Sequence, residues 1–173
     1  IHLYRVSGND EYLRVATNIA KNRLITREQM AGGNGYFGYG DGNSISGSIQ
    51  PSVMYAYAVE PIVTIYQETK DKDIGDLIVR MADFTKDSFL FGGKFNSQGQ
   101  YMPLQCTYIW RQNDPDGSQS GEAGEPIKTT FFADLFASAY QISGEAVYLD
   151  WARKCFRDTA FYHVAGGSQY LTP

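Results

Sequence analysis

The sequence predicts an all-α fold made of repeated helical hairpins, and three short stretches carry that prediction. SGNDEYLRVA, which begins at Ser7, and SGEAVYLDWA, which begins at Ser143, are identical at five positions in register. A weaker third copy begins at Thr69. In all three copies apolar residues recur at intervals of three and four, as they do along the buried face of a helix. Units of this kind bury their apolar faces by stacking on one another, so we expect a single domain.

A short turn separates two helices in each repeat. A glycine is expected to end the first helix, and a small polar or acidic residue to cap the second. The turns read Ser7-Gly8-Asn9, Thr69-Lys70-Asp71 and Ser143-Gly144-Glu145. Pro61, inside the apolar segment VMYAYAVEPIVTIY, should kink its helix or lie near its start. The predicted helices cover residues 10–24, 51–69, 73–90, 127–142 and 146–163.

The first repeat shows little of its leading helix. The segment IHLYRVSG predicts only the tail of that helix. We therefore expect Ile1 to lie inside a helix whose earlier residues precede this sequence, and an apolar patch at Tyr4 and Tyr12. The repeats then cover residues 1–50, 51–126 and 127–173. Hairpins that cannot bury their faces alone predict an arc of a larger ring or solenoid.

A pair of glycines followed by an aromatic residue recurs after the second helix of each repeat. The pairs are Gly32-Gly33, Gly92-Gly93 and Gly166-Gly167. Glycine is a common residue at helix ends, so each pair predicts a helix stop. The shared register indicates that the three helices end at the same level.

The connections at this Gly-Gly end are long, covering residues 24–50 and 91–128. Such connections in a compact domain are usually either functional or disordered. Their aromatic residues favour function, because disordered linkers are poor in them. The segment YMPLQCTYIW predicts a short β-hairpin that the turn NDPDG closes. Both connections leave the same end of their hairpins, so we expect them to gather on one rim, which is the predicted functional site.

An aromatic and polar rim suits carbohydrate. Sugar rings stack their C–H faces on aromatic side chains while their hydroxyl groups bond to polar ones. The predicted substrate-binding residues on the rim are Tyr36, Tyr39, Tyr101 and Trp110. Packing of the connections onto the helices is the alternative interpretation of the same aromatic residues.

Composition excludes several classes of partner. The formal net charge of −4 argues against nucleic acid, which attracts a basic surface. No apolar run reaches membrane-spanning length. The two histidines, His2 and His163, are far apart, and nothing predicts a metal site or a cofactor. Cys155 on a helix is expected to be a small buried apolar residue, and Cys106 lies in a connection, so their pairing stays open.

The segment FFADLFASAYQISGEAVYLDWARKCFRDTA resembles the hairpin repeat of α/α-toroid carbohydrate-active enzymes. These are the six-hairpin glycosidases and the toroidal polysaccharide lyases. The resemblance covers all three repeats and implies part of an (α/α) toroid, whose long loops line a cleft for polysaccharide. The remaining hairpins of the same toroid are then the other expected partner. A complete toroid has about six hairpins and this chain has three, and the Asn-His-Tyr motif of heparinase-like lyases is absent from it.

A hydrolase needs two carboxyl groups across a cleft, one of them protonated. Glu60 and Asp134 stand out because they occupy equivalent repeat positions inside apolar helices. The interpretation favoured from sequence is structural: each bonds a backbone group or an arginine between neighbouring hairpins. Asp41 is the carboxylate chosen on the rim. Other rim carboxylates are Asp114, Asp116, Glu122 and Glu125, and the first two are better explained as turn residues.

A lyase needs a cation to neutralise a uronate carboxylate and a base to remove the adjacent proton. Arg111 and Tyr108, beside Trp110, supply those chemical types. His163 falls in the last turn of its helix, where a favourable contact with the helix dipole explains it.

Two functions therefore stay open: part of a polysaccharide-degrading enzyme, either lyase or hydrolase, and a helical sugar-binding module without catalysis. A toroid of another class, such as a terpenoid cyclase-like one, would need an acidic or Cys/His metal motif that this sequence lacks. If the protein degrades polysaccharide, the periplasm or the exterior of the cell is the expected location.

Overall fold

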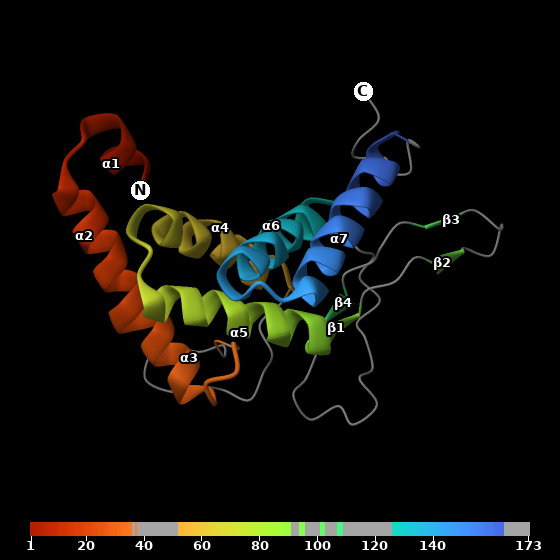
Figure 1. Cartoon of the computed structure of the whole chain (residues 1–173), viewed down its shortest axis with the longest axis horizontal. Coiled ribbons are helices and arrows are strands. Elements are labelled where there is room, and N and C mark those ends of the chain that lie inside the picture. Colours follow the sequence, from red (N-terminus) through yellow and green to blue (C-terminus); the bar gives the residue numbers. More distant parts are fainter. Residues whose placement is uncertain are drawn as a thin grey trace.

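The computed structural model describes the backbone of residues 1–35, 37, 52–90, 94–95, 101–102, 107–108 and 126–164. Side chains are described for residues 1–35, 37, 57–87 and 130–156. This part of the chain is mostly helical, which confirms the all-α class (Figure 1). None of the described helices has the length and apolar content needed to cross a lipid bilayer.

The helices form three hairpins. Hairpin 1 holds α1 (His2–Ser7) and a rod made of α2 (Asp10–Ile19), a π-helical turn (Ala20–Ile25) and α3 (Thr26–Met30). Hairpin 2 holds α4 (Ser52–Thr69) and α5 (Lys72–Ser88). Hairpin 3 holds α6 (Pro126–Ser143) and α7 (Ala146–Val164). The predicted bounds of the last four helices are correct to within two residues, but the rod of hairpin 1 continues six residues past the predicted end at Leu24.

The Gly-Gly stop is present where the structure describes it. The rod ends at Met30, and both Gly32 and Gly33 adopt positive φ angles, of 115° and 69°. The other two glycine pairs lie outside the described residues. Pro61 lies well inside α4 and not near its start.

Short strands are present, but their pairing corrects the predicted hairpin. β1 (Phe89–Leu90) pairs with β4 (Thr107–Tyr108), and β2 (Lys94–Phe95) pairs with β3 (Tyr101–Met102), both antiparallel. A hairpin within YMPLQCTYIW would pair β3 with β4. That prediction is wrong, because Phe89 and Leu90 directly follow α5 and supply the partner of β4. The described strands thus form two separate two-stranded sheets.

The three turns between helices use the same backbone bonds. In each turn a hydroxyl donates to the carbonyl four residues earlier and accepts the N–H two residues later. Three hydroxyls do this: Ser7, Thr69 and Ser143. The residue after each hydroxyl donates its N–H to the carbonyl of a tyrosine four residues back: Gly8 to Tyr4, Lys70 to Tyr66 and Gly144 to Tyr140. The repeat inferred from sequence is therefore present in the turns atom by atom.

The residue after the hydroxyl is left-handed in all three turns. Gly8, Lys70 and Gly144 have φ angles of 66°, 52° and 75°. Among the described residues Lys70 is the only non-glycine residue with a positive φ. Lysine at this position keeps the turn geometry at the steric cost of its Cβ.

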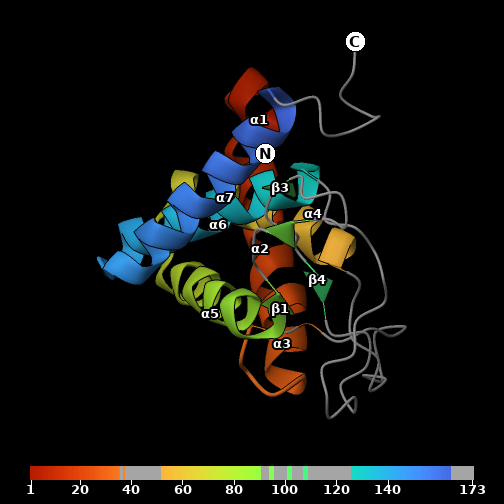
Figure 2. The same cartoon turned by 90° about the vertical axis from the view of Figure 1, so that its right-hand side faces the viewer.

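Helix α6 is the centre of the domain. It packs against α4, α5 and α7 (Figures 1 and 2). Phe132, Leu135, Phe136 and Ala139, spaced as one helical face, are fully buried on it. The stripe of α5 is equally buried, with Ile74, Leu77, Ile78 and Met81 all inaccessible to solvent. The core thus belongs mainly to hairpins 2 and 3.

Candidate functional site

The predicted rim residues lie mostly outside the described residues. Tyr36, Tyr39, Asp41, Trp110 and Arg111 belong to that group. Tyr101 and Tyr108 are placed by backbone only, in β3 and β4. Their predicted binding and catalytic roles stay predictions. The described residues nevertheless bring other side chains together close to where these connections meet the helices.

An aromatic pair, with Tyr57 exposed and Phe131 half-buried, joins α4 to α6. The rings of Tyr57 and Phe131 lie edge to face, with centroids 5.5 Å apart and planes at 74°. Tyr57 is 54% exposed although its helix is largely apolar. The two residues occupy equivalent repeat positions, each five residues after the first residue of its helix. The exposed ring of Tyr57, supported by Phe131, offers an apolar surface to a ligand.

A pair of carboxylates lies one helical turn further along the same face. Glu60 and Asp134 follow Tyr57 and Phe131 by three residues, and both are exposed. The pKa of Asp134 is raised, first because surrounding protein atoms desolvate its carboxyl group and second because Glu60 is close. Within the described part of the chain neither carboxylate has a hydrogen-bond or ion-pair partner, so the arginine or backbone contacts expected from sequence are not seen there. The carboxyl groups of Glu60 and Asp134 are thus close enough to influence each other electrostatically.

The polar character continues down both helices. Gln67 and Gln141, again equivalent in the repeat, are exposed two turns after the carboxylates. Residues three, seven and ten positions apart share one side of a helix. We call this surface the α4–α6 face; it consists of Tyr57, Glu60 and Gln67 on α4 with Phe131, Asp134 and Gln141 on α6.

Pro61 removes one hydrogen-bond donor from the interior of α4. Proline has no N–H, so the carbonyl of Tyr57, four residues earlier, lacks its usual helical donor. This carbonyl therefore has capacity to accept a bond from another group. Aromatic rings, carboxylates, amides and a carbonyl together match the mixed apolar and hydrogen-bonding surface of a sugar. A raised pKa keeps the carboxyl group of Asp134 protonated to a higher pH than usual, which suits a proton donor.

A buried ion pair fixes the start of the first long connection. Glu28 is the only fully buried charged residue among the described side chains. Arg80 on α5 donates to its two carboxylate oxygens over 2.8 and 3.0 Å. The N–H of Gly35 donates to the same carboxylate over 2.8 Å. A Cβ atom at Gly35 would lie 2.1 Å from the carbonyl oxygen of Arg80, so only glycine fits.

Sequence reasoning missed Glu28 because the helix was predicted to end before it. The connection that carries Tyr36, Tyr39 and Asp41 nevertheless leaves hairpin 1 from this fixed point. Arg27 also donates through Nε to the carbonyl of the buried Phe37, over 3.2 Å. The first connection is thus anchored on α5 before the predicted glycan-binding residues begin.

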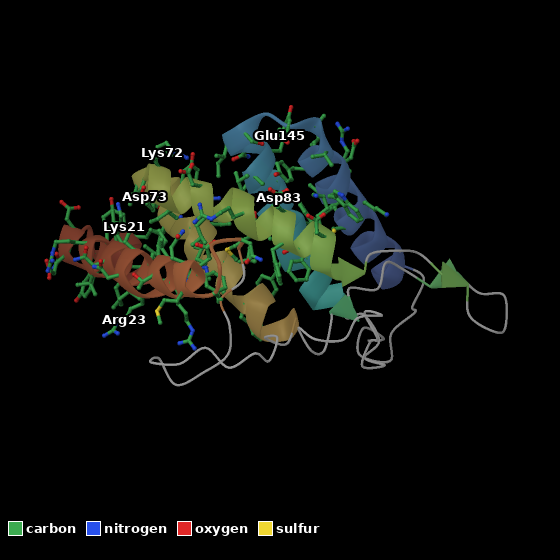
Figure 3. The ribbon with its side chains drawn as sticks, turned by 90° about the horizontal axis from the view of Figure 1, so that it is seen from below. Lys21, Arg23, Lys72, Asp73, Asp83 and Glu145 are labelled. Carbon is green, nitrogen blue, oxygen red and sulfur yellow. The ribbon has the colours of Figure 1, made fainter. Side chains whose placement is uncertain are left out.

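Lys21 forms another charged contact between hairpins 1 and 2. Its Nζ lies 2.9 Å from Asp71 and 2.7 Å from Asp73, at the start of α5 (Figure 3). Burial by itself would raise the pKa of Asp71, but Lys21 and the backbone N–H groups of Ile74 and Asp73 together hold it below its ordinary value. The pKa of Lys21 is raised by its bonds to Asp73 and Asp71. This cluster is occupied by its own partners and is structural.

Among the described residues no group of three or more histidine, cysteine or acidic side chains is arranged to hold a metal ion. Cys155 is fully buried, as expected for a small apolar residue on α7. Comparison with known proteins finds no matching family model, no similar curated protein and no similar solved structure. The chemistry of the α4–α6 face therefore has to support any functional assignment.

Proposed function

We propose that this chain is part of a polysaccharide-degrading enzyme and that the α4–α6 face, with the predicted rim beside it, binds the glycan. The observation that carries the proposal is the doubled pair on neighbouring helices: Tyr57 with Phe131, and Glu60 with Asp134. Repeated packing alone does not account for an exposed tyrosine in contact with a half-buried phenylalanine, or for two exposed carboxyl groups, at equivalent positions. We further propose that the hairpins belong to an (α/α) toroid, as their sequence pattern suggests.

The paired carboxylates favour hydrolysis over elimination. Glycoside hydrolases use one protonated and one ionised carboxyl group. In this proposal Asp134, whose pKa is raised, donates the proton to the leaving oxygen, and Glu60 supplies the second carboxyl group. Tyr57 and Phe131 hold a sugar ring beside them, and Trp110 with Tyr36, Tyr39 and Tyr101 extends the binding surface on the rim. Arg111 and Tyr108 remain the candidate catalytic residues if the reaction is an elimination, and Asp41 remains the rim carboxylate considered for hydrolysis.

The test is a screen of the protein against neutral and uronate-containing oligosaccharides. Release of reducing ends without absorbance from an unsaturated product supports the hydrolase. Asp134→Asn should abolish that release while retaining binding, and Tyr57→Ala should weaken binding by about tenfold. Asp150→Asn, an exposed aspartate on α7, is the matched control and should change neither.

Other outcomes separate the alternatives. Binding without turnover, unchanged by Asp134→Asn but lost in Tyr57→Ala, would support the sugar-binding module. Absorbance from an unsaturated product would select the lyase and move the chemistry to Arg111 and Tyr108. Absence of binding to every glycan, with the helices intact by circular dichroism, would refute the proposal.

A further inference from the structure

The apolar stripe of α2 is exposed where its repeat equivalents are buried. Tyr12, Val15 and Ile19 are 41%, 42% and 53% exposed. The same register positions are Ile74, Leu77 and Met81 on α5, all fully buried. On α7 they are Tyr148, Trp151 and Cys155, of which the first and last are buried and Trp151 is partly so. The three helices therefore have the same apolar face, and only one of these faces is uncovered.

Helix α1 shows the same difference. Leu3 is 63% exposed, whereas its equivalents Ile65 on α4 and Ala139 on α6 are 5% and 0% exposed. Leu3 lies on the helix next to α2 and extends the exposed stripe. We call the surface made of Leu3, Tyr12, Val15 and Ile19 the α2 face.

Hairpin 3 shows what covers such a face. Helix α6 lies along α7 and presents Phe132, Leu135, Phe136 and Ala139, at spacings of three, four and seven. Phe136 stacks on Trp151, with ring centroids 5.9 Å apart. In hairpin 1 only the last of these four positions has a counterpart, Leu3. The shared turn geometry fixes the direction of the covering helix, because α1 enters its turn by the bonds that α4 and α6 use.

We propose that the α2 face is the docking site of an α-helix that continues the line of α1, antiparallel to α2, and carries the apolar spacing of α6. The repeat defines this helix. It has large apolar residues at the positions of Phe132, Leu135 and Phe136, and no charged side chain on the side that contacts α2. Helix α2 lies at one end of the long axis, away from α7 (Figure 1). The proposal is independent of the glycan proposal, because it uses none of the same side chains.

A synthetic peptide with the sequence of residues 126–143 is the probe. Labelled peptide should bind the full chain, and Ile19→Glu or Val15→Glu should weaken that binding by at least about tenfold, because a charge would be buried against the peptide. Met30→Glu replaces an exposed apolar residue outside the α2 face and is the matched control. A peptide with serine in place of its three large apolar residues should not bind.

A covalent version tests the geometry. Residues 126–138, placed directly before Leu3 in place of residues 1–2, put the helix in register, and this chimera should unfold at a higher temperature than the original chain. Adding Ile19→Glu to the chimera should remove that gain. Failure of the peptide to bind, equal binding to Ile19→Glu, or a chimera no more stable than the original chain would overturn the proposal. Self-association of the chain that Ile19→Glu abolishes would also overturn it, since a second copy would then be the occupant.

Discussion

Hairpin 1 meets hairpin 2 through several charged pairs as well as apolar side chains, whereas hairpin 2 meets hairpin 3 mainly through apolar ones. The first contact contains the pairs of Arg5 with Glu68, Lys21 with Asp71 and Asp73, and Arg80 with Glu28. The second contains the buried faces of α5 and α6, and among the described residues no ion pair crosses it. The same repeat has thus been joined to its neighbour in two ways, so the two contacts should respond differently to mutation, salt and pH.

The largest difference should come from equivalent apolar residues. Leu77→Ala on α5 should lower the free energy of unfolding by about 2–5 kcal/mol, because it leaves a cavity in a fully buried site. Val15→Ala, at the same repeat position on α2, should change it by less than about 0.5 kcal/mol, because that side chain is exposed. Urea unfolding followed by circular dichroism measures both. Equal costs would show that the α2 face is already covered in the isolated chain.

A smaller effect is expected at the buried ion pair. Glu28→Gln should lower the free energy of unfolding by about 1–3 kcal/mol, because Arg80 and the N–H of Gly35 lose a charged acceptor in a buried site. Glu11→Gln removes the exposed partner of Arg14 and should leave the stability almost unchanged, because solvent screens this pair. Hydrogen exchange of α3 should rise in the first variant only. Unchanged exchange there would mean that Glu28 does not hold the two hairpins together.

Two aspartates should have opposite effects on stability. Asp71 has a lowered pKa, so it contributes stability above its ordinary value near 3.8, and that contribution is lost as the pH falls toward its folded value. Asp134 has a raised pKa, so its ionisation in the folded protein opposes stability above pH 3.8, and that penalty disappears at lower pH.

At pH 7, Asp71→Asn should therefore destabilise by about 0.5–1 kcal/mol, with the helix cap retained by the amide. Asp134→Asn should stabilise, and solvent screening keeps the gain within about 0.5 kcal/mol. Thermal unfolding of both variants at pH 7 and at pH 3 measures whether each change stabilises or destabilises the protein. A destabilising Asp134→Asn would show that this carboxylate has an attractive partner and would weaken its proposed role as a proton donor.

The smallest effect should come from the shared turns. Lys70→Gly relieves a left-handed non-glycine residue but removes a cation–π contact with Tyr66, at 5.1 Å. The net gain should be about 0.5 kcal/mol. Gly144→Lys, the reciprocal change in hairpin 3, should lower the free energy of unfolding by about 1 kcal/mol, because it puts a Cβ atom on a left-handed residue. If both variants destabilise, the three turns are less equivalent than their hydrogen bonds indicate.

Most of the fold could be predicted from the sequence because local patterns determine it. The helices of hairpins 2 and 3 follow a simple apolar period, and their turns have local caps. The rod of hairpin 1 was predicted too short because a π-helical turn, Ala20–Ile25, carries it past the point where that period breaks. The strand pairing was wrong for a different reason: β1 and β4 are separated along the chain, and β propensity does not identify the partner.

The candidate site was predicted only in part. The repeat spacing singled out Glu60 and Asp134, although the structural interpretation was favoured for both. Tyr57 and Phe131 were treated as apolar members of their helices. The structure leaves Tyr57 exposed and Phe131 half-buried. Tyr57 and Phe131 have the same spacing in the repeat as Glu60 and Asp134. A comparison of all equivalent helix positions would therefore have paired them from the sequence.

The central place of α6 has a consequence for synthesis on the ribosome. Chain growth runs from hairpin 1 to hairpin 3, but the helix that covers α4 and α5 comes last but one. Until α6 has left the exit tunnel, Ile74, Leu77 and Met81 have no complete cover. The nascent chain therefore passes through a stage at which a long apolar surface is open, and it is at this stage that chaperone capture or aggregation competes with folding.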